Sequence, residues 1–113
     1  MDGLMANLKA WVLGEAGGEP VEAVVIGRAG WQFDDFPKPP NHHPSKLNTV
    51  LKWKEAAPLL DYEFHDGFGA PGCQAITVWT ASKVIFVSQW DGATSIESVP
   101  RHPCDHEPTM PGG

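Results

Sequence analysis

The chain has 113 residues, 42% of them hydrophobic, and its 14 acidic and 8 basic side chains give a net charge of −6. Its length is typical of one domain, and its five Trp and five Phe residues can build a real core. A negative net charge is the opposite of what a phosphate-binding surface needs, so we expect no direct contact with nucleic acid.

The sequence also indicates the compartment. No apolar run is long enough to span a membrane, and the first residues lack the basic and apolar regions of a signal peptide. Two cysteines, Cys73 and Cys104, are too few for a disulfide framework, so we expect reduced thiols in a cytoplasmic protein. A Cys73–Cys104 bond stays open as an alternative, because a sequence does not show their separation.

Two short apolar segments near the N-terminus predict a β-hairpin. Residues 8–14 and 21–27 are both bounded by glycine, and the composition of residues 15–20 is that of a turn. The run Val24-Val25-Ile26 predicts a strand that is covered on both faces.

Residues 28–44 predict a long irregular loop. The segment holds four prolines, which remove backbone donors and fix φ, and it follows neither the strand nor the helix period. Loops this long inside a small domain are often functional. Aromatic side chains are enriched at binding hot spots, and neighbouring carboxylates attract a basic partner. We therefore predict a protein-binding site at Trp31, Phe33, Asp34, Asp35 and Phe36. The alternative is that these rings only complete the core.

The next segment predicts the one helix of the chain, from Lys46 to Leu59. Ser45 is a candidate N-cap, and apolar residues follow at helical spacing, with lysines on the opposite side. Pro58 is expected to end the helix. A single apolar stripe indicates that this helix packs across one face of a sheet.

Residues 60–100 predict an antiparallel β-meander. Tyr62 and Phe64 alternate with polar residues, and strands are expected at 73–80, 83–90 and 94–99, with Asp91-Gly92 as a two-residue hairpin turn. Strands that follow one another closely are expected to pair. The side chains expected to hold the helix are those of Tyr62, Phe64, Val84, Phe86 and Ile96.

These elements together predict a small α+β domain. The expected order is β-β-loop-α-β-β-β-β, with the helix packed on one sheet face. Residues 1–100 form the predicted domain, and the proline-rich residues 101–113 form a flexible C-terminal tail.

One strand carries a possible metal or catalytic site. Period-2 spacing would align Asp61, Glu63 and His65 on one face, about 7 Å apart in succession, with Asp66 beside them. Such a group could bind a metal ion or transfer protons. The simpler interpretation is the ordinary polar face of a half-buried strand. We therefore predict no cofactor.

Other candidate groups give weaker signals. His102, Cys104 and His106, like the His42-His43 pair, are natural zinc ligands, but their spacing matches no standard zinc module. Cys73 beside a glycine-rich loop could be a nucleophile, although a buried cysteine is more often a small hydrophobic residue. The serines lie in no nucleophile elbow, and the glycines at 67–72 do not open a phosphate-binding helix.

These observations favour a binding protein over an enzyme. The predicted function is that of an inhibitor or immunity-type protein, bacterial or phage, that neutralises a basic partner such as a nuclease or toxin. The alternatives are a metal-dependent enzyme that uses Asp61, Glu63 and His65, and an assembly subunit that forms homo-oligomers through its sheet edges.

Overall fold

The computed structural model describes residues 5–29, 44–65, 73–90 and 93–110. Its elements are β1 (Met5–Asn7), α1 (Leu8–Ala16), β2 (Ala23–Ala29), the 3-10 turn η2 (Pro44–Lys46), β3 (Val50–Leu51), α2 (Trp53–Leu60), β4 (Glu63–His65), β5 (Gln74–Trp79), β6 (Lys83–Trp90) and β7 (Ala93–Pro100). No helix in these ranges is long and apolar enough to cross a membrane.

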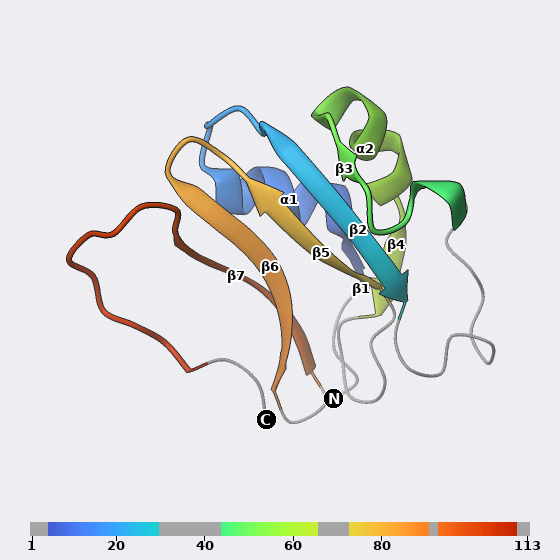
Figure 1. Ribbon diagram of the computed structural model, residues 1–113. Helices are drawn as coiled ribbons and strands as arrows, with labels where there is room; N and C mark the ends of the chain where they lie inside the picture. The colour runs from blue at the N-terminus through green and yellow to red at the C-terminus, as the bar shows by residue number, and fades with distance from the viewer. Residues whose placement is uncertain (1–4, 30–43, 66–72, 91–92, 111–113) are drawn as a thin grey trace.

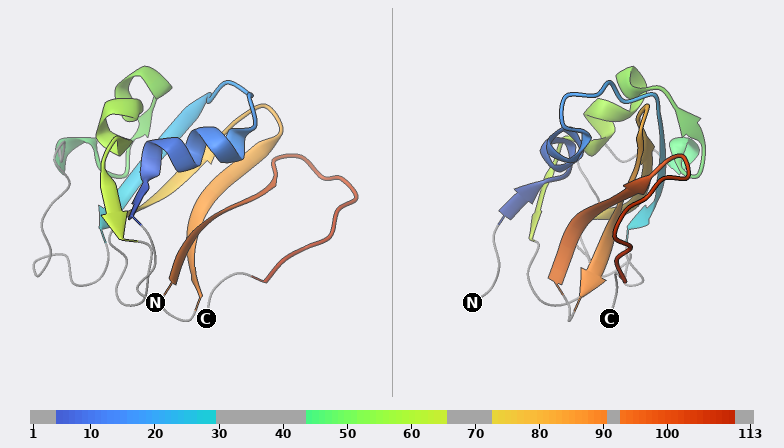
Figure 2. Two further views of the ribbon diagram at one scale, coloured as in Figure 1. Left: turned by 180° about the vertical axis from the view of Figure 1, so that it is seen from behind. Right: turned by 90° about the vertical axis from the view of Figure 1, so that its left-hand side faces the viewer.

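The molecule has two layers (Figure 1). One is a five-stranded antiparallel sheet in the order β3-β2-β5-β6-β7. The other contains α1, α2 and a two-stranded pair of β1 with β4. Helix α1 packs against β6 and β7, and α2 packs against β2. Figure 2 shows both helices on the same side of the sheet. The predicted class, a small α+β domain with a helix on one sheet face, is confirmed.

The predicted N-terminal hairpin is wrong, because residues 8–16 form helix α1. The Asn7 side chain caps this helix by accepting a hydrogen bond from the backbone N–H of Ala10 at 3.0 Å. Its buried residues, Leu8, Val12 and Ala16, follow one another at intervals of four. The helix ends at Gly17, whose φ of 60° suits glycine. A helix of this length with apolar residues on several sides resembles a buried strand in sequence.

The predicted helix over residues 46–59 is shorter than expected. Residues 50–51 form strand β3 and pair with Val24 and Val25, and α2 begins only at Trp53. Asn48, with φ of 59°, turns the chain before β3, which explains the early break. Pro58 lies inside α2 and does not end it. The helix continues to Leu60, which is fully buried.

The meander has three strands and not four. Strands β5, β6 and β7 lie close to their predicted limits, and β6 pairs with β7 along its whole length, from Lys83↔Pro100 to Trp90↔Ala93. Strand β4, however, pairs with β1 in the helical layer. It follows α2 after only two residues, so it stays beside that helix.

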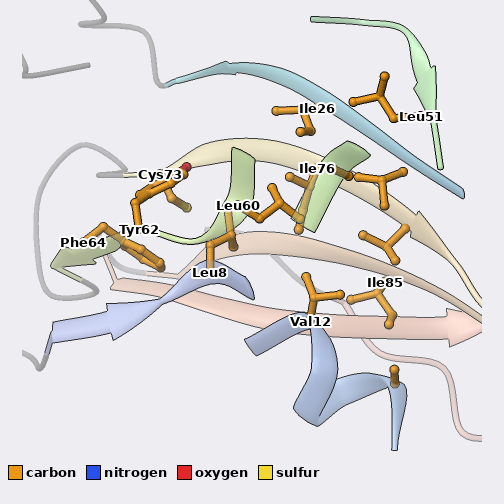
Figure 3. Close-up of a cluster of buried hydrophobic side chains, with 14 residues drawn as sticks. Leu8, Val12, Ile26, Leu51, Leu60, Tyr62, Phe64, Cys73, Ile76 and Ile85 are labelled. Atoms are coloured by element: carbon orange, nitrogen blue, oxygen red, sulfur yellow. The ribbon is translucent and has the colours of Figure 1, made fainter. Parts of the chain in front are cut away.

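The core lies between the two layers (Figure 3). Apolar side chains from the helical layer meet those of the sheet: Leu8, Val12, Leu60, Tyr62 and Phe64 on one side, Ile26, Ile76 and Ile85 on the other. The edge of one aromatic ring contacts the face of another at Trp11 and Phe64, with centroids 5.1 Å apart.

Val84 and Phe86 were expected to face the helix, and this is wrong. Their neighbour Ile85 is fully buried in the core, and side chains alternate along a strand. Val84 and Phe86 therefore lie on the face opposite the helices.

A buried polar group closes one end of the core. The Tyr62 hydroxyl accepts a hydrogen bond from the backbone N–H of Gln74 at 3.0 Å and donates to Gln74 Oε1 at 3.3 Å. Gln74 Nε2 in turn donates to the carbonyl of Gly27 at 3.2 Å. This chain of contacts ties the segment before β4 to β5 and β2.

Candidate binding surface

The predicted binding residues Trp31, Phe33, Asp34, Asp35 and Phe36 lie outside the residues that the structure describes. The residues that flank them are described. Before the segment, Ala29 pairs with Gln74 at the end of β2. After it, the backbone N–H of Asn48 donates to the carbonyl of Ile26 at 2.8 Å, and Val50 pairs with Val25. The chain thus leaves β2 before the segment and returns to β2 after it.

The Asp61, Glu63 and His65 group is only partly described. Asp61 and Glu63 are exposed, and Tyr62 and Phe64 are buried, as the alternation predicts. Asp61 is the C-cap residue of α2, and its Oδ1 accepts a hydrogen bond from Asn7 Nδ2 at 3.0 Å. The side chain of His65 lies outside the described part. Within the described part, no three His, Cys, Asp or Glu side chains come together as a metal site.

His102, Cys104 and His106 likewise form no metal site within the described residues. Residues 101–110 are all exposed, and the carbonyl of Cys104 lies 3.0 Å from His106 Nδ1. His42 and His43 lie outside the described residues. Arg101 is fixed, because its backbone N–H donates to the carbonyl of Ser82 at 2.9 Å and its guanidinium donates to the carbonyl of Thr80 at 2.8 Å.

Cys73 belongs to the core and not to a reactive site. It is 1% exposed, and burial raises the pKa of its thiol from 9.0 to about 12. The thiolate is the nucleophilic form, so the thiol of Cys73 is unreactive near neutral pH. Burial likewise raises the pKa of the Tyr62 hydroxyl beside it. Cys73 and Cys104 are both free, and only Cys104 is exposed.

One face of the five-stranded sheet is not covered by any described helix or strand. Figure 1 looks onto this face, and the right-hand view of Figure 2 shows that both helices lie on the other side. We call it the open face. The strand pairings place two rows of side chains across it. The first row is Val50, Val25, Thr77, Phe86 and Glu97, and the second is Ala23, Trp79, Val84 and Val99.

The open face is apolar in its centre. Trp79, Val84 and Phe86 are half-buried, while Val50 and Val99 near its two edges are 70% and 39% exposed. A shallow pocket of about 220 Å³ lies where β2 and β5 meet, lined by Val25, Gly27, Asn48, Ala75, Ile76 and Thr77. Neighbouring apolar side chains that remain partly exposed in this way are typical of interaction sites.

Charges of opposite sign lie at the two edges of the open face. At the β7 edge, Glu97 Oε2 accepts a hydrogen bond from Ser88 Oγ at 3.1 Å and lies 3.4 Å from Ser95 Oγ. At the β3 edge, Lys52 follows Val50 by two residues in extended backbone and is exposed. By alternation it lies on the same face as Val50. The open face is therefore negative at one edge and positive at the other.

Sequence reasoning missed the open face. A signal was present, because Lys83–Trp90 carries apolar residues at both odd and even positions, which indicates that both faces of that strand are apolar. The interpretation that both faces of β2 are covered is not supported in the described part, where Val24 and Ile26 are buried but Val25 is only half-buried.

Comparison of this chain with known proteins gives no match to a family model, to a curated protein or to a solved structure.

Proposed function

We propose that this protein acts by binding another protein. In this proposal it is a small acidic inhibitor or immunity-type protein of a bacterium or phage that neutralises a basic nuclease or toxin. The observation that carries the proposal is the double anchoring of the segment 30–43, which bears the predicted contact residues Trp31, Phe33, Asp34, Asp35 and Phe36.

The hydrogen bonds of the residues on either side of the segment support a binding role. Of the described flanking residues, Ala29 at the end of β2 pairs with Gln74 of β5, and the backbone N–H of Asn48 donates to the carbonyl of Ile26 in β2. A loop whose ends are fixed on a rigid sheet loses less entropy when it binds than a free chain would. The aromatic residues and the prolines in the sequence of the segment also favour binding, because aromatic side chains are enriched at hot spots and prolines restrict the backbone.

The charge of the chain indicates the class of partner. The net charge is −6, and Asp34 and Asp35 lie next to the aromatic residues. Proteins that act on nucleic acids carry basic surfaces, so an acidic protein attracts them over long distances and accelerates the encounter. The attraction weakens as salt screens it.

The first experiment identifies and then tests the partner. The purified chain is immobilised, proteins of its own host are passed over it at low salt, and those retained are identified by mass spectrometry. A retained nuclease or toxin is purified, and its activity and affinity are measured with and without this protein. The proposal expects a basic partner whose activity is inhibited and whose affinity falls as salt is added.

Variants then locate the binding site. Replacing Trp31, Phe33 and Phe36 together by alanine is expected to abolish inhibition while the circular dichroism spectrum stays unchanged. The matched control replaces three exposed apolar residues elsewhere, Met5, Leu13 and Met110, which are 57%, 45% and 92% exposed, and is expected to inhibit normally. Full inhibition by the folded Trp31, Phe33 and Phe36 variant would rule out the segment as the site.

A further inference from the structure

The open face has a composition that its place in the fold does not explain. A sheet face exposed to water usually carries polar residues, whereas here Val25, Trp79, Val84 and Phe86 form a continuous apolar centre. These four side chains belong neither to the buried core nor to the half-buried residues packed against it. Apolar surface of this kind is stabilised when another apolar surface covers it.

We propose that the open face binds the open face of a second copy of this chain, which forms a two-fold symmetric dimer. In such a dimer two sheets pack face to face, as in a β-sandwich, at a spacing of about 10 Å. The same surface serves both copies, which is the commonest form of homodimer interface. This inference does not depend on the partner proposed above.

The charges at the two edges support a second copy as the occupant. A surface with Lys52 at one edge and Glu97 at the other is complementary to itself when one copy is turned over. Two-fold rotation about an axis parallel to the strands places the β3 edge of one copy over the β7 edge of the other. This rotation leaves each row of side chains over the same row of the other copy, so Val50 faces the partner copy's Glu97 and Lys52 faces its Val99. Lys52 then lies one row, about 7 Å along the strand, from the partner copy's Glu97, which its long side chain can reach.

The charges also decide the orientation. The other face-to-face arrangement has its two-fold axis across the strands and stacks β7 on β7. That arrangement places the two Glu97 carboxylates along one edge and the two Lys52 ammonium groups along the other. Like charges brought together in this way oppose association. The axis parallel to the strands is therefore the favoured one, and it places β5 of each copy, with Thr77 and Trp79, at the centre of the interface.

The outer edge of β7 is a poorer site for a second copy. Arg101 N–H bonds to Ser82, so by alternation the backbone groups of Thr94, Ile96, Ser98 and Pro100 point away from β6. Thr94 is only 6% exposed, and Pro100 has no N–H to donate. Among the outward-pointing residues of β7, Ile96 and Ser98 therefore offer both backbone groups and Pro100 offers only its carbonyl, which is a short edge for an added strand.

Sedimentation velocity of the purified full-length chain tests the proposal across a concentration series. A reducing agent is present, so that the exposed Cys104 does not form a disulfide between copies. The wild-type chain is expected to be in equilibrium between monomer and dimer. Replacing Val50 and Val99 together by lysine is expected to leave only monomer. Leu13→Lys is the matched control, because Leu13 is 45% exposed but lies in the helical layer, and it is expected to dimerise normally.

A charge-swap cycle tests the orientation. Lys52→Glu and Glu97→Lys, each alone, are expected to raise the dimer Kd by about tenfold, since two symmetry-related ion pairs are lost together. The double variant is expected to return the Kd close to that of the wild type. Lys54→Glu in α2 is the control for charge alone and is expected to change the Kd little.

The proposal is overturned if the wild-type chain is monomeric at every concentration, or if Leu13→Lys disrupts the dimer as strongly as the lysines at Val50 and Val99. The stated orientation is overturned if the two single charge variants weaken the dimer and the double variant does not restore it. Circular dichroism of each variant confirms that a monomer is a folded monomer.

Discussion

Removal of one hydroxyl group, in Tyr62→Phe, is expected to destabilise this protein strongly. The Tyr62 oxygen accepts the backbone N–H of Gln74 at 3.0 Å and donates to Gln74 Oε1 at 3.3 Å. Both residues are buried, at 5% and 3% exposure. Phenylalanine keeps the packing of the ring but leaves a buried N–H without its partner.

The size of the effect follows from that unpaired group. A buried donor left unsatisfied costs about 1–3 kcal/mol, and the lost donation to Gln74 adds about 1 kcal/mol, so we expect a decrease of about 2–3 kcal/mol in the free energy of unfolding. That is a large part of the 5–15 kcal/mol that stabilises an ordinary domain. Urea denaturation measures it, and the midpoint should fall by about 1–2 M.

A matched control removes a hydroxyl at the surface. Thr49 Oγ1 donates to the carbonyl of Leu47 at 3.0 Å, but the residue is exposed, so water can replace this bond. Thr49→Val should change the free energy of unfolding by less than about 0.5 kcal/mol. If Tyr62→Phe were as mild as Thr49→Val, the phenolic oxygen would not be the partner on which the Gln74 N–H depends.

Two further predictions concern stability. Below pH 9 the Cys73 thiol is protonated in both the folded and the unfolded chain. Above pH 9 the thiol of the unfolded chain loses its proton, whereas burial holds the pKa of the folded chain's thiol near 12. Stability should therefore fall as pH rises from 9, and in urea titrations at pH 8–10 Cys73→Ala should remove most of this slope whereas Cys104→Ala should not. Tyr62, whose pKa burial also raises, accounts for the part that remains near pH 10. In α1, Gly14 has open space at its Cβ position, so Gly14→Ala should raise the melting temperature by the equivalent of about 0.5–1 kcal/mol. Gly17→Ala, at a φ of +60°, should lower it by about 1 kcal/mol, and equal effects at the two positions would contradict the left-handed cap.

The sequence by itself determined the part of the fold that depends on neighbouring residues. Strands β5, β6 and β7 lie where the alternation and the Asp91-Gly92 turn predict them, because a two-residue hairpin fixes both the pairing and the register of its strands. The burial of Tyr62 and Phe64 follows from the same period-2 pattern.

The tertiary structure decided what local pattern left open. Residues 8–16 are apolar on several sides, so only the Asn7 cap and the contacts with β6 and β7 make them a helix. Val50 and Leu51 form a strand because β2 offers a free edge, and β4 pairs with β1 because α2 holds it in the helical layer. Such pairings depend on the position of distant elements, which residue spacing does not encode.

Of the two candidate sites, one was predicted from the sequence and the other was seen only in the tertiary structure. The composition of residues 28–44 predicts a binding loop, since proline and aromatic content is a local property, and this stays a prediction because residues 30–43 lie outside the described residues. The open face was not predictable, because Val84 and Phe86 on one side of β6 are as apolar as Ile85 and Val87 on the other. The packing of α1 and α2 decided which side became the core, and no described helix or strand covers the other side, because the helices bury a single face of the sheet.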